Sequence, residues 1–155
     1  MSPGARVRPE RRASARHETE VVELSREECL ALIGTHRLGR VVVVMPNGAA
    51  VIRPVNYVFD RASHSVVFRS ARGSKLHALL HAPRAKFEVD DFDEAQRTGW
   101  SVIIEGPASE VASPDLRRFQ RLGLDPWAPG AKPHWVQVRA TTVSGRQVRR
   151  LLAPA

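Results

Sequence analysis

The sequence predicts a mainly β fold: six antiparallel strands that form a small closed or split β-barrel, with short helices inserted between the strands. Six segments are β-branched or alternate between apolar and polar residues, and Gly, Pro and Asn turns separate them. The first three segments are joined by turns too short for a crossover helix, so their strands are antiparallel. A small sheet with this many strands exposes fewer backbone edges when it curls into a barrel.

Length and composition fit a single domain. The 155 residues are 43% hydrophobic and 26% charged, which suits one core. No window approaches the roughly 18 apolar residues of a membrane span, and the Arg-rich start lacks the apolar region of a signal peptide. The single cysteine, Cys29, excludes an internal disulfide and fits a reducing compartment. We therefore expect a cytoplasmic protein that does not enter a membrane.

The N-terminal segment is basic. Five arginines lie within the first sixteen residues, among Pro, Ser, Gly and Ala and without apolar periodicity. Residues 1–18 are expected to be a disordered tail, and residues 19–150 the folded domain. The net charge of +8 raises nucleic acid as a partner of the tail. We favour that partner less, because no recognisable reading module follows and the preference for Arg over Lys can arise from coding-sequence GC content.

The ordered part of the chain is expected to begin near Val21, and the first helix follows directly. Ser25 and Glu28 have the spacing of a capping box, so the helix is expected to begin after Ser25 and to end at Gly34. Strands are then predicted at residues 39–45, 50–59 and 66–70, with turns at 46–48 and 60–63. Pro54 has no amide proton, which places it at a β-bulge or where its nitrogen faces away from a neighbouring strand.

The second half of the chain supplies three more strands and two helices. The pattern predicts a helix at 74–81, a strand at 86–90, an acidic turn at 91–94 and a long strand at 100–111 that bends near Gly106. A helix opens at Ser113-Pro114-Asp115 and ends at Gly123. A loop rich in Pro, Gly and Trp covers residues 124–133, and the last strand is predicted at 134–144.

Residues 68–76 are the most informative for function. This segment leads from a strand through a glycine turn into a helix, and it presents Arg69, Ser70, Arg72, Ser74 and Lys75. A phosphomonoester is held by such cationic and hydroxyl groups and by the free amides of a helix N-terminus. The alternative is a solvated basic turn. Trp100, Trp127 and Trp135 are candidate walls for a planar heterocycle attached to that phosphate, although such residues are also typical of a core.

A series of short motifs resembles the pyridoxamine 5'-phosphate oxidase-like flavoproteins, especially the actinobacterial split-barrel branch. In order, these motifs are Gly39-Arg40-Val41, Pro54-Val55-Asn56-Tyr57, Val67-Phe68-Arg69-Ser70 with Gly73-Ser74-Lys75-Leu76, Phe87-Glu88-Val89-Asp90-Asp91, Thr98-Gly99-Trp100-Ser101-Val102 with Glu105-Gly106, and Trp135-Val136 with Ser144-Gly145-Arg146. The resemblance covers about residues 24–148.

The resemblance implies a homodimer that binds FMN at the subunit interface, with residues 19–150 as the flavin-binding domain. Arg69, Ser70, Ser74 and Lys75 match the family's phosphate-binding positions, and Phe68 belongs to the same motif. Pro54, Val55, Asn56 and Tyr57 match the strand beside the flavin ring. Trp100 and Ser101 match positions near the ring, and Arg146 matches a late residue that the partner subunit contributes.

The resemblance also implies an oxidoreductase in which the bound flavin transfers hydride or electrons with a small molecule. The ending from Gln147 to Ala155 lacks the aromatic-rich, Arg-containing segment of true pyridoxamine 5'-phosphate oxidases, so that substrate is not carried over. Relatives with a short ending include flavin reductases, deazaflavin-dependent reductases and haem-associated proteins. A flavin, deazaflavin or haem carrier without turnover is therefore the alternative on the same barrel.

No metal site and no catalytic side chain are assigned. Asp90, Asp91, Asp93 and Glu94 lack the spacing of a calcium loop and are expected to be solvated. His77 and His81 are four residues apart on a helix, but no third ligand is patterned nearby, so they are expected to be surface histidines.

Overall fold

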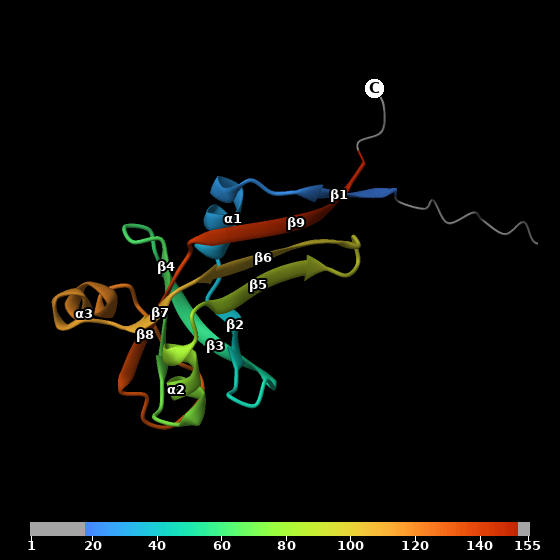
Figure 1. Cartoon of the computed structure of the whole chain (residues 1–155). Coiled ribbons are helices and arrows are strands. Elements are labelled where there is room, and N and C mark those ends of the chain that lie inside the picture. The colour runs from blue at the N-terminus through green and yellow to red at the C-terminus, as the bar shows by residue number, and fades with distance from the viewer. Residues whose placement is uncertain (1–17, 152–155) are drawn as a thin grey trace, which may run out of the picture.

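The computed structural model describes residues 18–151, so the expected basic tail falls outside the described residues except for Glu18 (Figure 1). Within residues 18–151, nine strands and three helices follow one another. They are β1 (Thr19–Glu23), α1 (Arg26–Ile33), β2 (Leu38–Val44), β3 (Ala50–Asp60), β4 (Ser65–Ser70), α2 (Ser74–His81), β5 (Ala85–Asp93), β6 (Thr98–Gly106), β7 (Ala108–Glu110), α3 (Ser113–Gln120), β8 (His134–Arg139) and β9 (Thr142–Arg150).

The strands form one curled antiparallel sheet in the order β1-β9-β6-β5-β2-β3-β4-β8-β7. Three chain segments run from one half of the sheet to the other. Strand β3 pairs with β2 and then with β4, β6 continues into β7, and β8 continues into β9. The three helices lie outside the sheet (Figure 1). The predicted mainly β split barrel is confirmed.

The number of strands differs from the six expected. The segment 100–111 divides at Pro107 into β6 and β7, and the segment 134–144 divides at Ala140 into β8 and the beginning of β9. Each break occurs where the backbone leaves one half of the sheet and joins the other. In addition, residues 19–23 form β1 against β9, and Asp91 to Asp93 belong to β5 rather than to an acidic turn.

The first helix is capped as its sequence predicts. The Glu28 amide donates to Ser25 Oγ at 3.2 Å, and the Ser25 amide donates to Glu28 Oε2 at 2.7 Å. Two of the free amides at the start of α1 are thereby satisfied. Gly34 ends the helix, as expected.

Pro54 lies in an unbroken register, which excludes the β-bulge. Strand β2 pairs with β3 residue by residue from Leu38↔Asn56 to Val44↔Ala50. The Tyr57 amide donates to the Arg37 carbonyl on the β2 side. Because alternate residues direct their amides to opposite edges, the Pro54 nitrogen faces the other edge, where no strand pairs with it. The second of the two expected positions for Pro54 is therefore correct.

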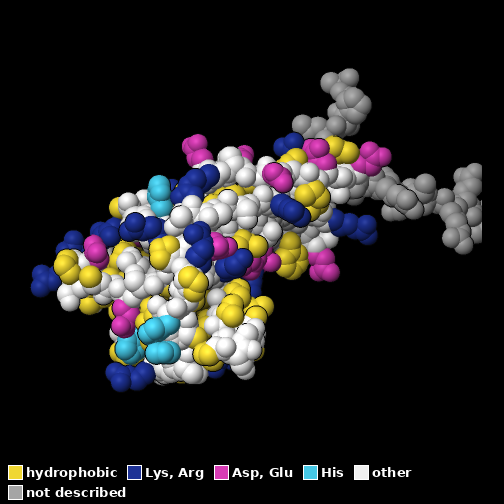
Figure 2. Space-filling model, in the orientation of Figure 1, with side chains coloured by type: hydrophobic (Ala, Val, Ile, Leu, Met, Phe, Trp, Pro, Cys, Tyr) yellow, Lys and Arg dark blue, Asp and Glu magenta, His cyan; other side chains and the backbone are white. Residues whose placement is uncertain are grey.

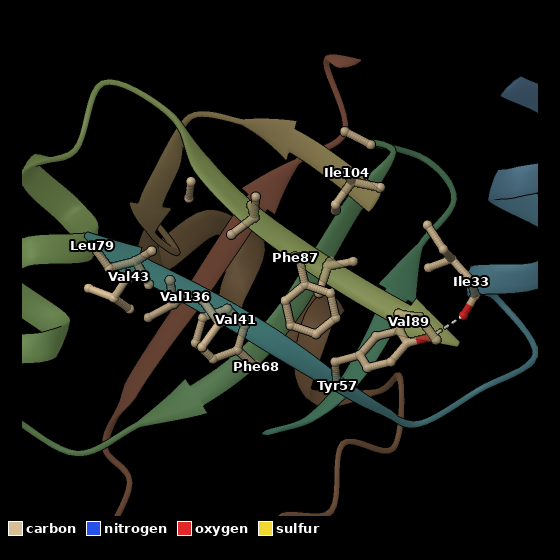
Figure 3. Packing of buried hydrophobic residues seen from close by; sticks show 14 of the residues in the cluster. Ile33, Val41, Val43, Tyr57, Phe68, Leu79, Phe87, Val89, Ile104 and Val136 are labelled. Atoms are coloured by element: carbon tan, nitrogen blue, oxygen red, sulfur yellow. Dashed lines mark hydrogen bonds between the residues drawn. The ribbon is translucent and has the colours of Figure 1, made fainter. Parts of the chain in front are cut away.

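The barrel interior is packed with apolar side chains. Tyr57, Phe68 and Phe87 meet at its centre, and valine and isoleucine side chains from β2, β5, β6 and β8 surround them (Figure 3). The Tyr57 and Phe87 ring centroids are 5.1 Å apart in an edge-on contact. A smaller cluster of Val58, Val67 and Phe119 fixes α3 to the other face of β3 and β4.

Charged side chains cover the outside. Lys and Arg are interspersed with acidic and apolar side chains on the face shown in Figure 2, instead of forming one basic stripe. Among residues 18–151, no helix is long and apolar enough to cross a membrane.

Candidate functional site

The site lies where strands β3 and β4 separate. They pair from Asp60↔Ser65 to Tyr57↔Phe68. Beyond this point β3 continues beside β2, whereas Arg69 and Ser70 of β4 continue beside β8. The two strands therefore diverge and leave a hollow of about 220 Å³ between them, which we call the split hollow. The start of α2 and Lys132 close its remaining sides.

The split hollow is apolar on one side and cationic on the other. Its apolar residues are Val41, Val43, Pro54, Val55, Phe68, Ala71, Leu76 and Leu79, and its polar residues are Arg53, Arg69, Ser70, Lys75 and Lys132. Four cationic side chains thus line it, and this lining includes no acidic residue. Such a lining suits an anion that carries an apolar body.

Two of the cations are held in place by the backbone. Arg69 Nε donates to the Lys132 carbonyl at 2.8 Å, and the guanidinium carbon lies 5.3 Å from the centroid of the Trp135 ring. Lys132 Nζ donates to the carbonyls of Ala128 and Pro129 at 2.8 and 3.0 Å. These bonds fold the 124–133 loop against the end of β4 and fix the positive charge beside the hollow.

The first turn of α2 adds main-chain donors. Gly73 is the N-cap residue and provides no side-chain hydrogen bond, and no acidic residue lies in the first turn. The amides at this helix start have no partner within the helix, and the helix dipole is positive there. Ser74 and Lys75 occupy this turn, so hydroxyl, ammonium and amide groups come together at one corner of the hollow.

The residues expected at the phosphate and two of those expected beside the ring, Pro54 and Val55, come together. Pro54, Val55, Phe68, Arg69, Ser70 and Lys75 line the split hollow, and Ser74 begins the adjoining helix. Two of the residues expected beside the ring have other contacts. The Asn56 side chain accepts a 2.8 Å hydrogen bond from the Trp127 amide. The Tyr57 side chain is fully buried in the core, and its hydroxyl donates to the Ile33 carbonyl.

Trp100, Ser101 and Arg146 lie apart from the split hollow in the same chain. They line a second hollow of about 390 Å³ beside β6 and β9, where Ser101 and Arg146 are paired in register. The Trp100 and His36 rings form a T-shaped pair, with centroids 4.9 Å apart. A single chain therefore presents the expected site residues as two separate groups.

Two of the four cationic lining residues, Arg53 and Lys132, were not expected from the sequence. Arg53 projects from the same face of β3 as Val55, since its register partner Val41 is a core residue. The alternation along β3 was the signal that could have identified it. Lys132 lies in an irregular loop with no periodicity, so no local signal points to it.

The residue types that bind metal ions do not cluster in the described part of the chain. Within residues 18–151, no three His, Cys, Asp or Glu side chains gather in a way that could hold a metal ion. His77 and His81 stack on the exposed side of α2, with ring centroids 3.9 Å apart, and His81 Nδ1 lies 2.8 Å from the His77 carbonyl.

Comparisons with known proteins agree with this architecture. An uncharacterised protein of Mycobacterium tuberculosis is 35% identical over 154 residues, which are 96% of this chain and 95% of that protein. The structure of the FAD binding protein from Mycobacterium smegmatis superposes with a TM-score of 0.71 at 38% identity, covering 84% of this chain and all of that one. A crystal structure from Corynebacterium glutamicum, described as a putative pyridoxamine 5'-phosphate oxidase, gives a TM-score of 0.70 at 28% identity and covers 87% of this chain and 96% of that one.

The model of one family matches most of the folded domain. It is the family described as pyridoxamine 5'-phosphate oxidase, and the match extends over residues 25–147, from the α1 cap to the middle of β9. The chain therefore belongs to the pyridoxamine 5'-phosphate oxidase-like family.

Proposed function

We propose that this protein is a flavin-dependent oxidoreductase that binds FMN in the split hollow. The observation that carries the proposal is the lining of the hollow, with four cations and a free helix start on one side and an apolar surface on the other. A flavin nucleotide has the matching composition, since a phosphate is joined through a ribityl chain to a planar, largely apolar ring.

The phosphate would lie at the corner formed by Arg69, Ser70, Ser74 and Lys75. Charge-assisted hydrogen bonds from Arg and Lys are stronger than neutral ones, and the amides at the helix start need no rearrangement to donate. Gly73 leaves the approach open, because a Cβ built there meets no atom within 4 Å.

The ring would lie along the unpaired edge of β3. Backbone groups of Ile52, Pro54 and Asn56 are directed to this edge, as the alternation from Tyr57 requires. The carbonyls of these three residues and the amides of Ile52 and Asn56 are the kind of groups that pair with the uracil-like edge of a flavin. The bound flavin supplies hydride or electron transfer, and the residues of this chain orient the ring, exclude water and place Arg53 near it.

We further propose that two copies share each site. The volume of about 220 Å³ lies below the roughly 300 to 1,000 Å³ that is typical of small-molecule sites, so one chain would enclose only part of the nucleotide. Ile52 and Ile103 are 57% and 44% exposed, and the register places them on the same outer face of the sheet. A second copy covering this face would bring its Trp100, Ser101 and Arg146 toward the ring.

The alternatives differ in ligand or in turnover. Haem is axially held by His, Cys, Met or Tyr, and none of these types lines the split hollow. Flavin is therefore favoured over haem. FMN and FAD share the phosphate that the corner would hold, and the Mycobacterium smegmatis relative is described as binding FAD. A carrier that binds flavin or deazaflavin without turnover uses the same groups, so only a reduction assay distinguishes it.

We place the protein in the cytosol, because its one cysteine, Cys29, is a free and buried thiol. A nucleic-acid partner remains less favoured. If the tail bound nucleic acid, the affinity for nucleic acid would fall steeply with rising salt concentration and would disappear when residues 1–18 are removed.

The test is titration of the purified protein with FMN and with FAD, followed by flavin fluorescence. Lys75→Ala and Arg69→Ala are each expected to weaken binding about tenfold or more. Arg117→Ala on α3 removes an exposed charge outside the hollow and serves as the matched control. A protein that does not alter flavin fluorescence, or equal weakening by the Arg117 control, would contradict the proposal. Flavin that binds but is not reduced by NADH, NADPH or a reduced deazaflavin would indicate a carrier.

A further inference from the structure

Another hollow lies between helix α1 and the turn that joins β3 to β4. It has a volume of about 490 Å³, and we call it the α1 hollow. Its lining residues are Arg26, Glu27, Leu30 and Ala31 from α1, Phe59 from β3, and Arg61 and His64 from the turn. None of them lines the split hollow, and its volume is within the range that is typical of small-molecule sites.

The α1 hollow combines an apolar surface with a positive rim. Leu30, Ala31 and Phe59 provide carbon surface, whereas the two arginines, Arg26 and Arg61, outnumber the one acidic residue, Glu27. Among residues 18–151, no carboxylate lies within ion-pair distance of Arg61, so its charge is not neutralised there. A cationic group at the edge of an apolar hollow favours a ligand with the opposite charge and an apolar body.

The two walls of the hollow are tied to one residue, Ala140. The Ala140 amide donates to the His64 carbonyl at 2.8 Å, which fixes the turn. The Ala140 carbonyl accepts from Arg26 Nη2 at 2.6 Å, which fixes the first turn of α1. Because both walls share this support, the hollow is formed before any ligand binds, and binding would not require the walls to be ordered.

Hydrogen bonds to Asp60 also hold the turn between β3 and β4 in place. Buried Asp60 accepts hydrogen bonds from the Ser63 amide at 3.1 Å and from Arg118 Nη1 at 2.5 Å. His64 has a φ of 49°, in the left-handed region that non-glycine residues seldom adopt and that is enriched at ligand-binding sites. This conformation holds the His64 side chain at the rim of the hollow.

We propose that the α1 hollow binds a small amphipathic carboxylate. Its alkyl or aromatic body would pack on Leu30, Ala31 and Phe59, and its carboxylate would be bound by Arg61, whose planar guanidinium can donate two parallel hydrogen bonds. Arg26 keeps its bonds to the backbone and adds positive potential. The site is separate from the flavin and does not depend on the proposed function.

The test uses octanoate as the probe, with the full chain saturated with FMN if FMN binds. When octanoate is titrated, the backbone amide NMR resonances of Leu30, Ala31 and Phe59 are expected to shift. The compounds 1-octanol and octylamine, which have the same chain length, are expected to bind at least tenfold more weakly than octanoate. Arg61→Gln should weaken octanoate about tenfold, whereas Arg117→Gln, which removes one distant charge, should not.

A second variant keeps the test decisive if Arg61→Gln disturbs the turn. Ala31 is exposed on α1, so Ala31→Phe fills the hollow without entering the core and is expected to abolish octanoate binding. Equal affinity for octanoate and octanol would overturn the proposal. So would shifts confined to the split hollow, or octanoate binding that Ala31→Phe leaves unchanged.

Discussion

The Tyr57 hydroxyl donates a hydrogen bond of 2.6 Å to the backbone carbonyl of Ile33 inside the core (Figure 3). Burial raises the pKa of Tyr57 well above its ordinary value, so the hydroxyl remains a donor at physiological pH. Tyr57 is also the first residue of β3 that pairs with β4. The bond thus fixes the end of α1 to the point where the barrel begins to open.

Tyr57→Phe is expected to lower the free energy of unfolding by about 1 kcal/mol. The substitution removes the donor and leaves the Ile33 carbonyl with only the longer bond of 3.4 Å from the His36 amide. Urea denaturation measures the change. Flavin affinity is expected to stay the same, because the Tyr57 side chain does not line the split hollow. Weaker flavin binding at unchanged stability would instead assign Tyr57 a direct contact with the ligand.

The buried Asp60 carboxylate predicts a loss of stability in acid. Burial by itself would raise the pKa of Asp60, but hydrogen bonds from Ser63 and Arg118 outweigh it and lower the pKa below its usual 3.8. A carboxyl whose pKa is lower in the folded state stabilises the fold fully above the unfolded pKa. This stabilisation is lost as the pH falls through the folded pKa, so the free energy of unfolding should decrease below about pH 4.

Asp60→Asn isolates this contribution from that of the other carboxylates. At pH 7 the variant is expected to be less stable by about 2 kcal/mol, since the bond to Arg118 loses its charge assistance. Its stability should also depend less on pH between 2 and 5, measured by thermal unfolding. An unchanged acid dependence would show that other groups, such as Glu28 and Glu105, dominate.

Two glycines are expected to respond in opposite ways to alanine. A Cβ at Gly106 would lie 1.8 Å from the Arg139 carbonyl oxygen, where the β6–β7 bend crosses the end of β8. Gly106→Ala must therefore move backbone, at a cost of about 3 kcal/mol. Gly73→Ala meets open space and should leave stability within about 0.5 kcal/mol, while its methyl group weakens FMN binding at the phosphate corner. Denaturation and FMN titration of both variants test this contrast.

Local signals predicted the parts of the fold that local bonds form. The Ser25–Glu28 capping box and the Pro46-Asn47-Gly48 turn appear where the sequence placed them. The break between β8 and β9 could not be predicted, because residues 134–144 read as one continuous strand. The break is fixed by residues distant in the sequence, since the Ala140 amide donates to the His64 backbone carbonyl and the Thr141 amide donates to the Glu105 backbone carbonyl.

The same distinction holds for the candidate site. Arg69, Ser70, Ser74 and Lys75 are close in sequence, and one strand-to-helix corner gathers them. Arg53 and Lys132 reach the split hollow through strand register and a loop, which no short motif encodes. The separation of Trp100 from this corner also depends on the whole sheet, because β6 lies four places from β4 in the strand order.

Mixing two defective variants tests the shared-site proposal. One chain would carry Arg69→Ala and Lys75→Ala, which remove its phosphate corner, and the other would carry Trp100→Ala. If each site takes its corner from one copy and Trp100 from the other, each pure variant has two defective sites. A mixed dimer has one intact site, because the corner of the Trp100→Ala chain meets the unchanged Trp100 of its partner.

FMN binding by such a mixture should therefore recover to one site per mixed dimer, or about a quarter of all sites after random exchange of subunits. The recovered sites should bind with the affinity of the original protein, measured by titration after the two chains have been unfolded and refolded together. Ile103→Arg, which replaces an exposed apolar side chain on the outer face of β6 by a charge, should prevent recovery by keeping the chains apart. No recovery in a mixture that sediments as dimers would show that one chain supplies the corner and Trp100 to the same flavin.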